Sequence, residues 1–228
     1  MIQTNNHRIS GFTLVELMLA MAFVAVLLLA VGGVVMQIGG IYSKGSTMKS
    51  VNQASRSIVA DMRRTIGESA PFALETSLKA AEGRLCTGTY SYVWNIGSEA
   101  DSEDASTQLN RFAGGDSDKQ LRLVRIRDSG KQYCAGTASA PIRFSDATEL
   151  LSYGNLAVQQ LAVEQLTTNV TNGLALYAIT ILVSDADKGA INTIGKCKLP
   201  SEDASYQNYC AVNEIDFTAQ AGNKGGRQ

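Results

Sequence analysis

The feature that most constrains this 228-residue chain is an apolar run near its N-terminus, Leu17–Met36, which contains no charged residue. At 1.5 Å per residue, a helix of about 20 residues is about 30 Å long, which matches the hydrocarbon core of a bilayer. The sequence therefore predicts a membrane-spanning helix close to the N-terminus.

Glu16 stands at the start of this run, and a carboxylate beside hydrocarbon usually has a partner or a function. A secretory signal peptide would have a shorter apolar core, with its small-residue cleavage site after that core. Here the small residues of Ala30–Gly33 lie inside the core. A plain single-pass anchor, whose Glu16 reaches the lipid headgroups, stays open as an alternative.

The residues around Glu16 resemble a known processing motif. The sequence GFTLVELMLAM follows a short polar leader with Arg8, and it resembles the prepilin signal of type IV pilins and type II secretion pseudopilins. The resemblance implies that a prepilin peptidase cleaves after Gly11 and methylates the amine of Phe12. It also implies that Glu16 pairs with the N-terminal amine of a neighbouring subunit. Two such charges, both displaced from water, would stabilise each other.

Past the span, apolar residues recur at spacings of three and four, which is typical of one face of a helix. This face comprises Met48, Val51, Ser55, Ile58, Val59, Met62 and Ile66. Gly67 and Pro71 then end the helical pattern. We therefore expect one long helix, with an apolar first half and an amphipathic second half.

This pattern divides the chain into four expected parts. They are a leader at 1–11, a transmembrane or filament-core helix at 12–41, its amphipathic continuation at 42–67, and an extracytoplasmic domain at 68–228. The pairs Gly32–Gly33 and Gly39–Gly40 lie in the second part, where each glycine costs a helix up to about 1 kcal/mol. We expect them either to unwind locally in a filament or to let helices approach closely.

The region after Pro71 predicts a short helix that ends at Gly83, followed by strands. Apolar and aromatic runs place the strands at 85–96, 121–127, 157–163, 174–183 and 212–217, with 174–183 at the centre of the sheet. Polar loops are expected at 97–107 and 114–119, and a frayed tail at 221–228. Because no βαβ alternation occurs, the pattern favours an α+β fold with an antiparallel sheet. The resemblance likewise implies a pilin-like fold, with the helix packed on that sheet.

All four cysteines follow the membrane segment: Cys86, Cys134, Cys197 and Cys210. An even number in an exported domain indicates two disulfides, and four cysteines permit three pairings. We expect Cys86–Cys134 and Cys197–Cys210, because short loops close most readily. Four buried free thiols remain the alternative. The closing loop at Cys197–Cys210 loosely resembles the C-terminal disulfide region of pilins.

Other functional classes have little support in the sequence. The only histidine, His7, lies in the leader, and no nucleophile or phosphate-binding motif occurs, so an enzyme is not expected. No cofactor or metal is expected, although Asp185–Gly189 gives weak support to calcium. Arg122, Arg125 and Arg127 form the one basic cluster, which we attribute to charges on an edge strand, so nucleic acid is not expected as a partner.

The sequence thus predicts a structural protein rather than an enzyme. The expected partners are prepilin peptidase, other pilin subunits with the pilus assembly machinery, and inner-membrane lipids. The chain would first lie in the inner membrane with its C-terminal domain outside, and then in an extracellular pilus or a periplasmic pseudopilus.

A minor pilin is the leading interpretation of the role within the filament. Asp61-Met62-Arg63 loosely resembles the helix of larger minor pilins, the PilW and J-type pseudopilin group. A type II secretion pseudopilin and a major pilin are the alternatives within the class. An uncleaved, membrane-anchored binding domain is the alternative from another class.

Overall fold

The computed structural model describes residues 12–97, 110–114, 119–135, 142–151, 155–169, 173–187, 189–199, 201–202 and 209–222. The chain forms two compact units, one extending to Tyr42 and the other beginning at Ser43. The expected leader with Gly11, most of the loop 97–107, the centre of the turn 114–119 and nearly all of the tail lie outside the described residues.

The long helix α1 spans Leu14–Gly67, which is 54 residues. It ends at Gly67, as the glycine and the following proline predict, and the Ser69 N–H donates to the Ile66 carbonyl at 3.0 Å just beyond its end. Both glycine pairs lie within α1. The helix is therefore continuous through them in the isolated chain, and their behaviour in a filament stays a prediction.

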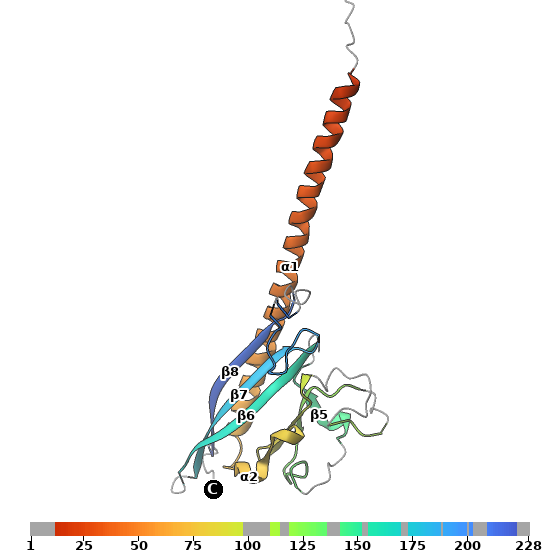
Figure 1. Ribbon diagram of the computed structural model, residues 1–228. Coiled ribbons are helices and arrows are strands. Elements are labelled where there is room, and N and C mark those ends of the chain that lie inside the picture. The colour runs from red at the N-terminus through yellow and green to blue at the C-terminus, as the bar shows by residue number, and fades with distance from the viewer. Residues whose placement is uncertain are drawn as a thin grey trace, which may run out of the picture. The chain divides into compact units, whose positions relative to one another are not determined.

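The second unit contains two antiparallel sheets rather than one. The first, in strand order, comprises β1 (Leu78–Lys79), β2 (Arg84–Cys86), β3 (Tyr90–Trp94), β4 (Leu123–Arg127) and β5 (Ala147–Glu149). The second comprises β6 (Leu156–Asn169), β7 (Leu174–Asp185) and β8 (Val212–Ala221), which run side by side in Figure 1. A single parallel bridge, Ile96 to Val158, connects the two sheets.

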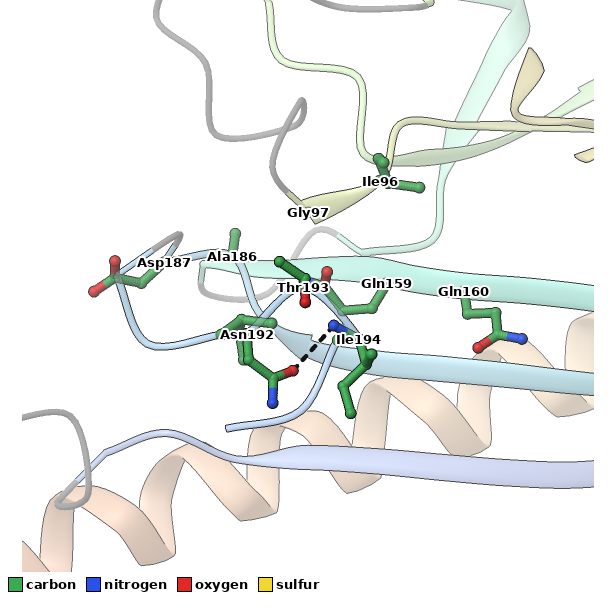
Figure 2. Close-up of a pocket in the computed structure, with 11 residues that line it drawn as sticks. Ile96, Gly97, Gln159, Gln160, Ala186, Asp187, Asn192, Thr193 and Ile194 are labelled. Carbon is green, nitrogen blue, oxygen red and sulfur yellow. Dashed lines mark hydrogen bonds between the residues drawn. The ribbon is translucent and has the colours of Figure 1, made fainter. Parts of the chain in front are cut away.

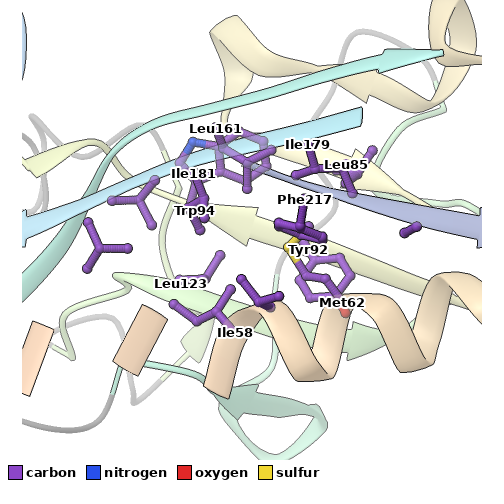
Figure 3. Close-up of a cluster of buried hydrophobic side chains, with 14 of the residues drawn as sticks. Ile58, Met62, Leu85, Tyr92, Trp94, Leu123, Leu161, Ile179, Ile181 and Phe217 are labelled. Atoms are coloured by element: carbon purple, nitrogen blue, oxygen red, sulfur yellow. The ribbon is translucent and has the colours of Figure 1, made fainter. Parts of the chain in front are cut away.

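One apolar core joins the second half of α1 to both sheets. Val51, Ile58, Met62 and Ile66 are fully buried and pack with Tyr92 and Trp94 of β3, Leu123 of β4, and Tyr177, Ile179 and Phe217 of β7 and β8. Figure 3 shows Ile58 and Met62 of α1 facing side chains of these strands. The predicted amphipathic face of α1 from Val51 to Ile66 is therefore the face that organises the domain, whereas Met48, also expected on this face, is 47% exposed because the buried contacts begin at Val51.

A polar network crosses this core and fixes α1 against the first sheet. The Asp61 carboxylate forms an ion pair with Arg125 of β4, and it accepts hydrogen bonds from Tyr92 Oη and Arg64 Nη2, both at 3.0 Å. The hydroxyls of Thr65 and Tyr92 are also bonded to each other. Burial raises the pKa of the Tyr92 hydroxyl well above its usual range, so this group remains a donor.

Several expected elements have different boundaries. The helix expected to end at Gly83 is instead α2 (Leu74–Ser77), β1 and a 3-10 turn η1 (Ala80–Glu82), because Leu78 and Lys79 pair with Leu85 and Arg84. The expected stop at Gly83 is confirmed, because Gly83 caps η1 in the left-handed conformation with φ 64°.

The expected strand 85–96 is wrong, since Gly88 with φ 96° turns it into the hairpin of β2 and β3. The expected position of β7 at the centre of its sheet is confirmed, and β6 and β8 extend beyond the expected 157–163 and 212–217. The strand β5 follows the 3-10 turn η4 (Phe144–Asp146) and was not expected from the sequence. It has three residues, all paired with β4, and so short a strand leaves no alternating pattern to recognise.

Replacing Asp61 tests the polar network. With Asp61→Ala, Arg125 keeps its charge at a site where its side chain is only 16% exposed, so the free energy of unfolding should fall by about 3 kcal/mol. The double variant Asp61→Leu/Arg125→Leu should recover most of this loss. Denaturant unfolding of the full chain in detergent, followed by the fluorescence of Trp94, measures both. The exposed Arg127→Ala on the same strand is the control, with a change within about 0.5 kcal/mol.

Glu149 of β5 provides a test of pH dependence. Burial raises the pKa of its carboxyl above the ordinary value of 4.5, although the backbone N–H groups of Leu123 and Leu151 oppose the shift. Above pH 4.5 the unfolded chain loses this proton first, so the carboxyl's contribution to stability falls until pH exceeds the folded-state pKa. Glu149→Gln should therefore gain stability relative to the parent chain between pH 4 and pH 7.

Urea unfolding at several pH values measures this difference, with exposed Glu164→Gln as the matched control for loss of one carboxylate. A constant difference between the Glu149→Gln and parent chains across that range would contradict the assignment.

Candidate functional site

The described chain begins at Phe12, immediately before α1, and this segment carries the residues that the sequence singled out. The ring of Phe12 is exposed, and the backbone becomes helical at Leu14. Gly11 lies outside the described residues, so the cleavage position stays a prediction.

Glu16 has a local partner within the first turn of α1. Its Oε2 accepts hydrogen bonds from the Thr13 backbone N–H at 3.0 Å and from Thr13 Oγ1 at 2.9 Å. The Glu16 N–H lies 3.3 Å from Thr13 Oγ1, to which it donates. This reciprocal arrangement is a capping box, in which two side chains satisfy backbone donors that the helix leaves unpaired.

The capping box was missed in the sequence, although it has a recognisable pattern. Thr13-Leu14-Val15-Glu16 matches the spacing of Ser or Thr followed three residues later by Glu. A negative side chain is also favoured at this end of a helix by the helix dipole. Glu16 therefore stabilises the start of α1 in the isolated chain, whether or not it has a further partner in an assembly.

The rest of the first unit presents an apolar surface. Every large hydrophobic side chain from Phe12 to Tyr42 is exposed, from 49% for Leu27 to 85% for Phe12. Exposed apolar surface of this extent marks contact with a membrane or with other proteins. Among the described residues, α1 is the one helix long and apolar enough to cross a membrane.

The glycine pairs add open space to this surface. An added Cβ at Gly32, Gly33 or Gly39 would meet no atom within 4 Å. The isolated chain therefore gives no steric reason for glycine at these positions, and either expected role requires a neighbouring helix.

The four cysteines form two disulfides, Cys86–Cys134 and Cys197–Cys210. No cysteine is free. The first ties β2 to the loop after β4, and the second closes the segment between β7 and β8. Their pairing is the sequential one among the three possible arrangements.

The fold gives different surroundings to the three arginines of the basic cluster, of which Arg125 and Arg127 lie on β4 and Arg122 lies just before it. β4 lies between β3 and β5, so the edge-strand explanation of its charges is wrong. Arg125 pairs with Asp61, and Arg122 Nη2 donates to Asn155 Oδ1 at 2.8 Å, so these two side chains meet different parts of the domain. Arg127 is exposed. These three residues do not form a continuous basic surface for nucleic acid.

The carboxylates of Asp185 and Asp187 serve the loop in which they lie. Asp185 Oδ1 accepts from the Asp187 N–H at 3.0 Å, and Asp187 Oδ1 accepts from the Gly189 N–H at 2.8 Å. Asp187 Oδ2 accepts from the Tyr209 hydroxyl at 3.1 Å. Within the described residues, no group of three or more His, Cys, Asp or Glu side chains could hold a metal ion.

A pocket of about 600 Å³ lies where the bridge between Ile96 and Val158 joins the sheets. Gln159, the extra residue at a bulge of β6, lies between Gly97 and the loop around Thr193 in Figure 2. An added Cβ at Gly97 would lie 1.9 Å from Gln159 Nε2, so the Gln159 side chain would have to move. The described lining residues carry amide, aliphatic and hydroxyl side chains with Asp187 as their one carboxylate, and they include no nucleophile paired with a base.

Removing the cap tests its role at the start of α1. Thr13→Ala deletes one acceptor and one donor of the capping box and should weaken the first helical turn by about 1 kcal/mol. Hydrogen exchange of the Glu16 and Leu17 amides, which donate to the Thr13 hydroxyl and the Thr13 carbonyl, should become severalfold faster on the full chain in detergent. Thr13→Ser, which keeps the hydroxyl, is the matched control and should exchange like the parent chain. Equal protection in all three chains would show that the box contributes nothing.

Comparisons with known proteins bear on this N-terminal segment. The family described as the prokaryotic N-terminal methylation motif matches residues 6–35, which include Gly11, Phe12, Glu16 and most of the apolar run. Neither the curated proteins nor the solved structures give a match to the chain. The motif, the exposed apolar helix and the α+β domain with two disulfides together support assignment of the chain to the type IV pilin-like family.

Proposed function

We propose that this chain is a minor pilin, a structural subunit of a type IV pilus or related filament. The observation that carries the proposal is the N-terminal methylation motif at the head of a helix whose apolar side chains are all exposed in its first half. The motif belongs to prepilin-like substrates, and the apolar helix supports anchoring of the chain in a membrane through its N-terminus.

In this proposal, prepilin peptidase cleaves after Gly11 and methylates Phe12. The new amine then lies next to Thr13, one turn from the Glu16 carboxylate. In the isolated chain that carboxylate accepts hydrogen bonds from Thr13. During assembly it would exchange at least one of these bonds for the amine of a neighbouring subunit. Helix packing in the filament core would remove the exposed apolar surface from lipid, and the charge pair would fix the register between subunits.

The domain fits the periplasmic or extracellular side. Both of its disulfides require an oxidising compartment, which supports a topology with the C-terminal domain outside the inner membrane. The domain has two sheets, whereas a minimal major pilin needs only one sheet packed on its helix. This larger domain supports a minor rather than a major subunit. Partners in this proposal are prepilin peptidase, other pilins, the assembly machinery and inner-membrane lipids.

The capping box favours one competing function. Because Glu16 is hydrogen-bonded within its own helix, its presence is explained even in a chain that never assembles. An uncleaved membrane-anchored binding domain would keep Met1 and would use the apolar helix only as an anchor.

Mass spectrometry of the N-terminal peptide separates these functions. In membranes from cells with prepilin peptidase, the chain should begin at methylated Phe12, and in cells without the enzyme it should begin at Met1. Gly11→Val is the matched control and should retain the leader in both strains. An intact leader on the parent chain in peptidase-positive cells would contradict the filament proposal and leave the anchored domain.

Glu16→Gln separates the two roles of Glu16. Its amide oxygen can still accept from Thr13, so α1 should begin as before, but no negative charge remains for a neighbouring amine. We expect normal processing, with the amount of this chain in sheared filaments reduced at least about tenfold, equivalent to roughly 1.4 kcal/mol. Glu16→Asp, which keeps the charge, is the comparison. Wild-type incorporation of Glu16→Gln would assign the residue to capping alone.

A further inference from the structure

The exposed side of α1 in the second unit carries a line of positive charge. Lys49, Arg56 and Arg63 are all exposed and are seven residues apart. Seven residues are nearly two helical turns, so the three side chains follow one line over about 21 Å of helix. Between Ser43 and Gly67 the only acidic residue is Asp61, which faces Arg125 and Tyr92.

This line borders a groove between α1 and β8. The groove has a volume of about 300 Å³ and is lined by Arg56, Val59, Ala60 and Arg63 of α1 and by Ile215, Asp216 and Phe217 of β8. Asp216 is the one carboxylate among the described lining residues, and it also accepts a hydrogen bond from the Thr180 hydroxyl of β7. Arg56 and Arg63 outnumber it, so the lining keeps a net positive charge. The guanidinium of Arg63 lies 5.4 Å from the centre of the Phe217 ring, which keeps this cation at the groove wall.

Among the described strands, none pairs with the outer edge of β8. In the described sheet it is the terminal strand, paired with β7 on one side only. The outer edge of such a strand presents backbone groups that an extended segment can pair with. The groove therefore combines a strand edge, apolar side chains and a line of cations, which suits an extended acidic segment.

The same chain contains a segment of complementary charge. Residues 98–109 include Glu99, Asp101, Glu103 and Asp104 and no basic residue. Six residues from Glu99 to Asp104 reach at most about 20 Å when extended, which is close to the length of the basic line. Charge complementarity of this kind selects partners and orients them.

We propose that the groove between α1 and β8 binds the acidic segment 98–109 of a second copy of this chain. Groove and segment are different surfaces, so the contact is heterologous and leaves a free groove and a free segment at the two ends of each pair. Such a contact can join neighbouring copies without closing them into a symmetric dimer, and it repeats only where several copies adjoin. The inference deepens the proposed filament function, on which it rests for its setting, and names a contact between domains.

Photo-cross-linking of the full chain in membranes tests the contact. Benzoylphenylalanine at Ala60 places the probe in the groove, and mixing unlabelled with ¹⁵N-labelled chains distinguishes cross-links between copies from those within one copy. We expect cross-links between copies to the peptide that contains 98–109. Their yield should fall in 0.5 M salt, because salt screens the exposed charges of Lys49, Arg56 and Arg63.

Charge reversal sharpens the test. Arg56→Glu/Arg63→Glu and, separately, Glu99→Lys/Glu103→Lys should each lower the yield about tenfold, and the combination should restore it. Arg127→Glu, an exposed reversal on β4, is the matched control and should leave the yield unchanged. Cross-links confined to one copy, to a different peptide, or insensitive to both reversals would overturn the proposal.

The N-terminal mass of the same samples separates this proposal from the filament function. Methylated Phe12 without the expected cross-link would overturn the docking contact and leave the pilin function standing. Cross-links between chains that retain Met1 would support the docking contact and contradict the pilin function.

Discussion

The uncharged run Leu17–Met36 must be removed from water, and so must the apolar face in the second half of the same helix. The rest of the structure follows from the different ways in which the two halves of α1 meet this requirement. In its first half, α1 exposes apolar side chains on every side, which suits lipid or the helices of neighbouring subunits. In its second half only one face is apolar, and that face is buried under two sheets. A single helix thus combines an apolar half that suits an anchor with a half that is the central element of a domain.

Much of this could be predicted from sequence periodicity. The end of α1 at Gly67 and the buried face at Val51, Ile58 and Met62 follow from local spacing, and the central strand β7 follows from its apolar composition. The hairpin at Gly88 was hidden because apolar residues continue on both sides of it, so one strand was expected where two pair. The division into two sheets depends on long-range pairing, which local patterns do not encode.

The polar contacts were harder to foresee than the apolar ones. Arg125 and Asp61 are 64 residues apart, and nothing in the sequence indicates that one cation of the basic cluster is the partner of that carboxylate. The Thr13–Glu16 capping box, by contrast, has a three-residue spacing that could have been recognised. It shows that the acidic residue of the motif has a role in its own helix, which any account of assembly has to include.

Fluorescence quenching tests the central claim, that the apolar half of α1 lies in the bilayer while the domain stays outside. Val24→Trp adds a second tryptophan to a chain whose single native one, Trp94, is buried in the domain core. In vesicles with lipids brominated near the bilayer centre, we predict no quenching of the Trp94 emission, which the parent chain reports alone. The additional emission of the Val24→Trp variant should be strongly quenched. Unquenched emission from both chains would contradict membrane insertion, and the anchor and the filament core would fall with it.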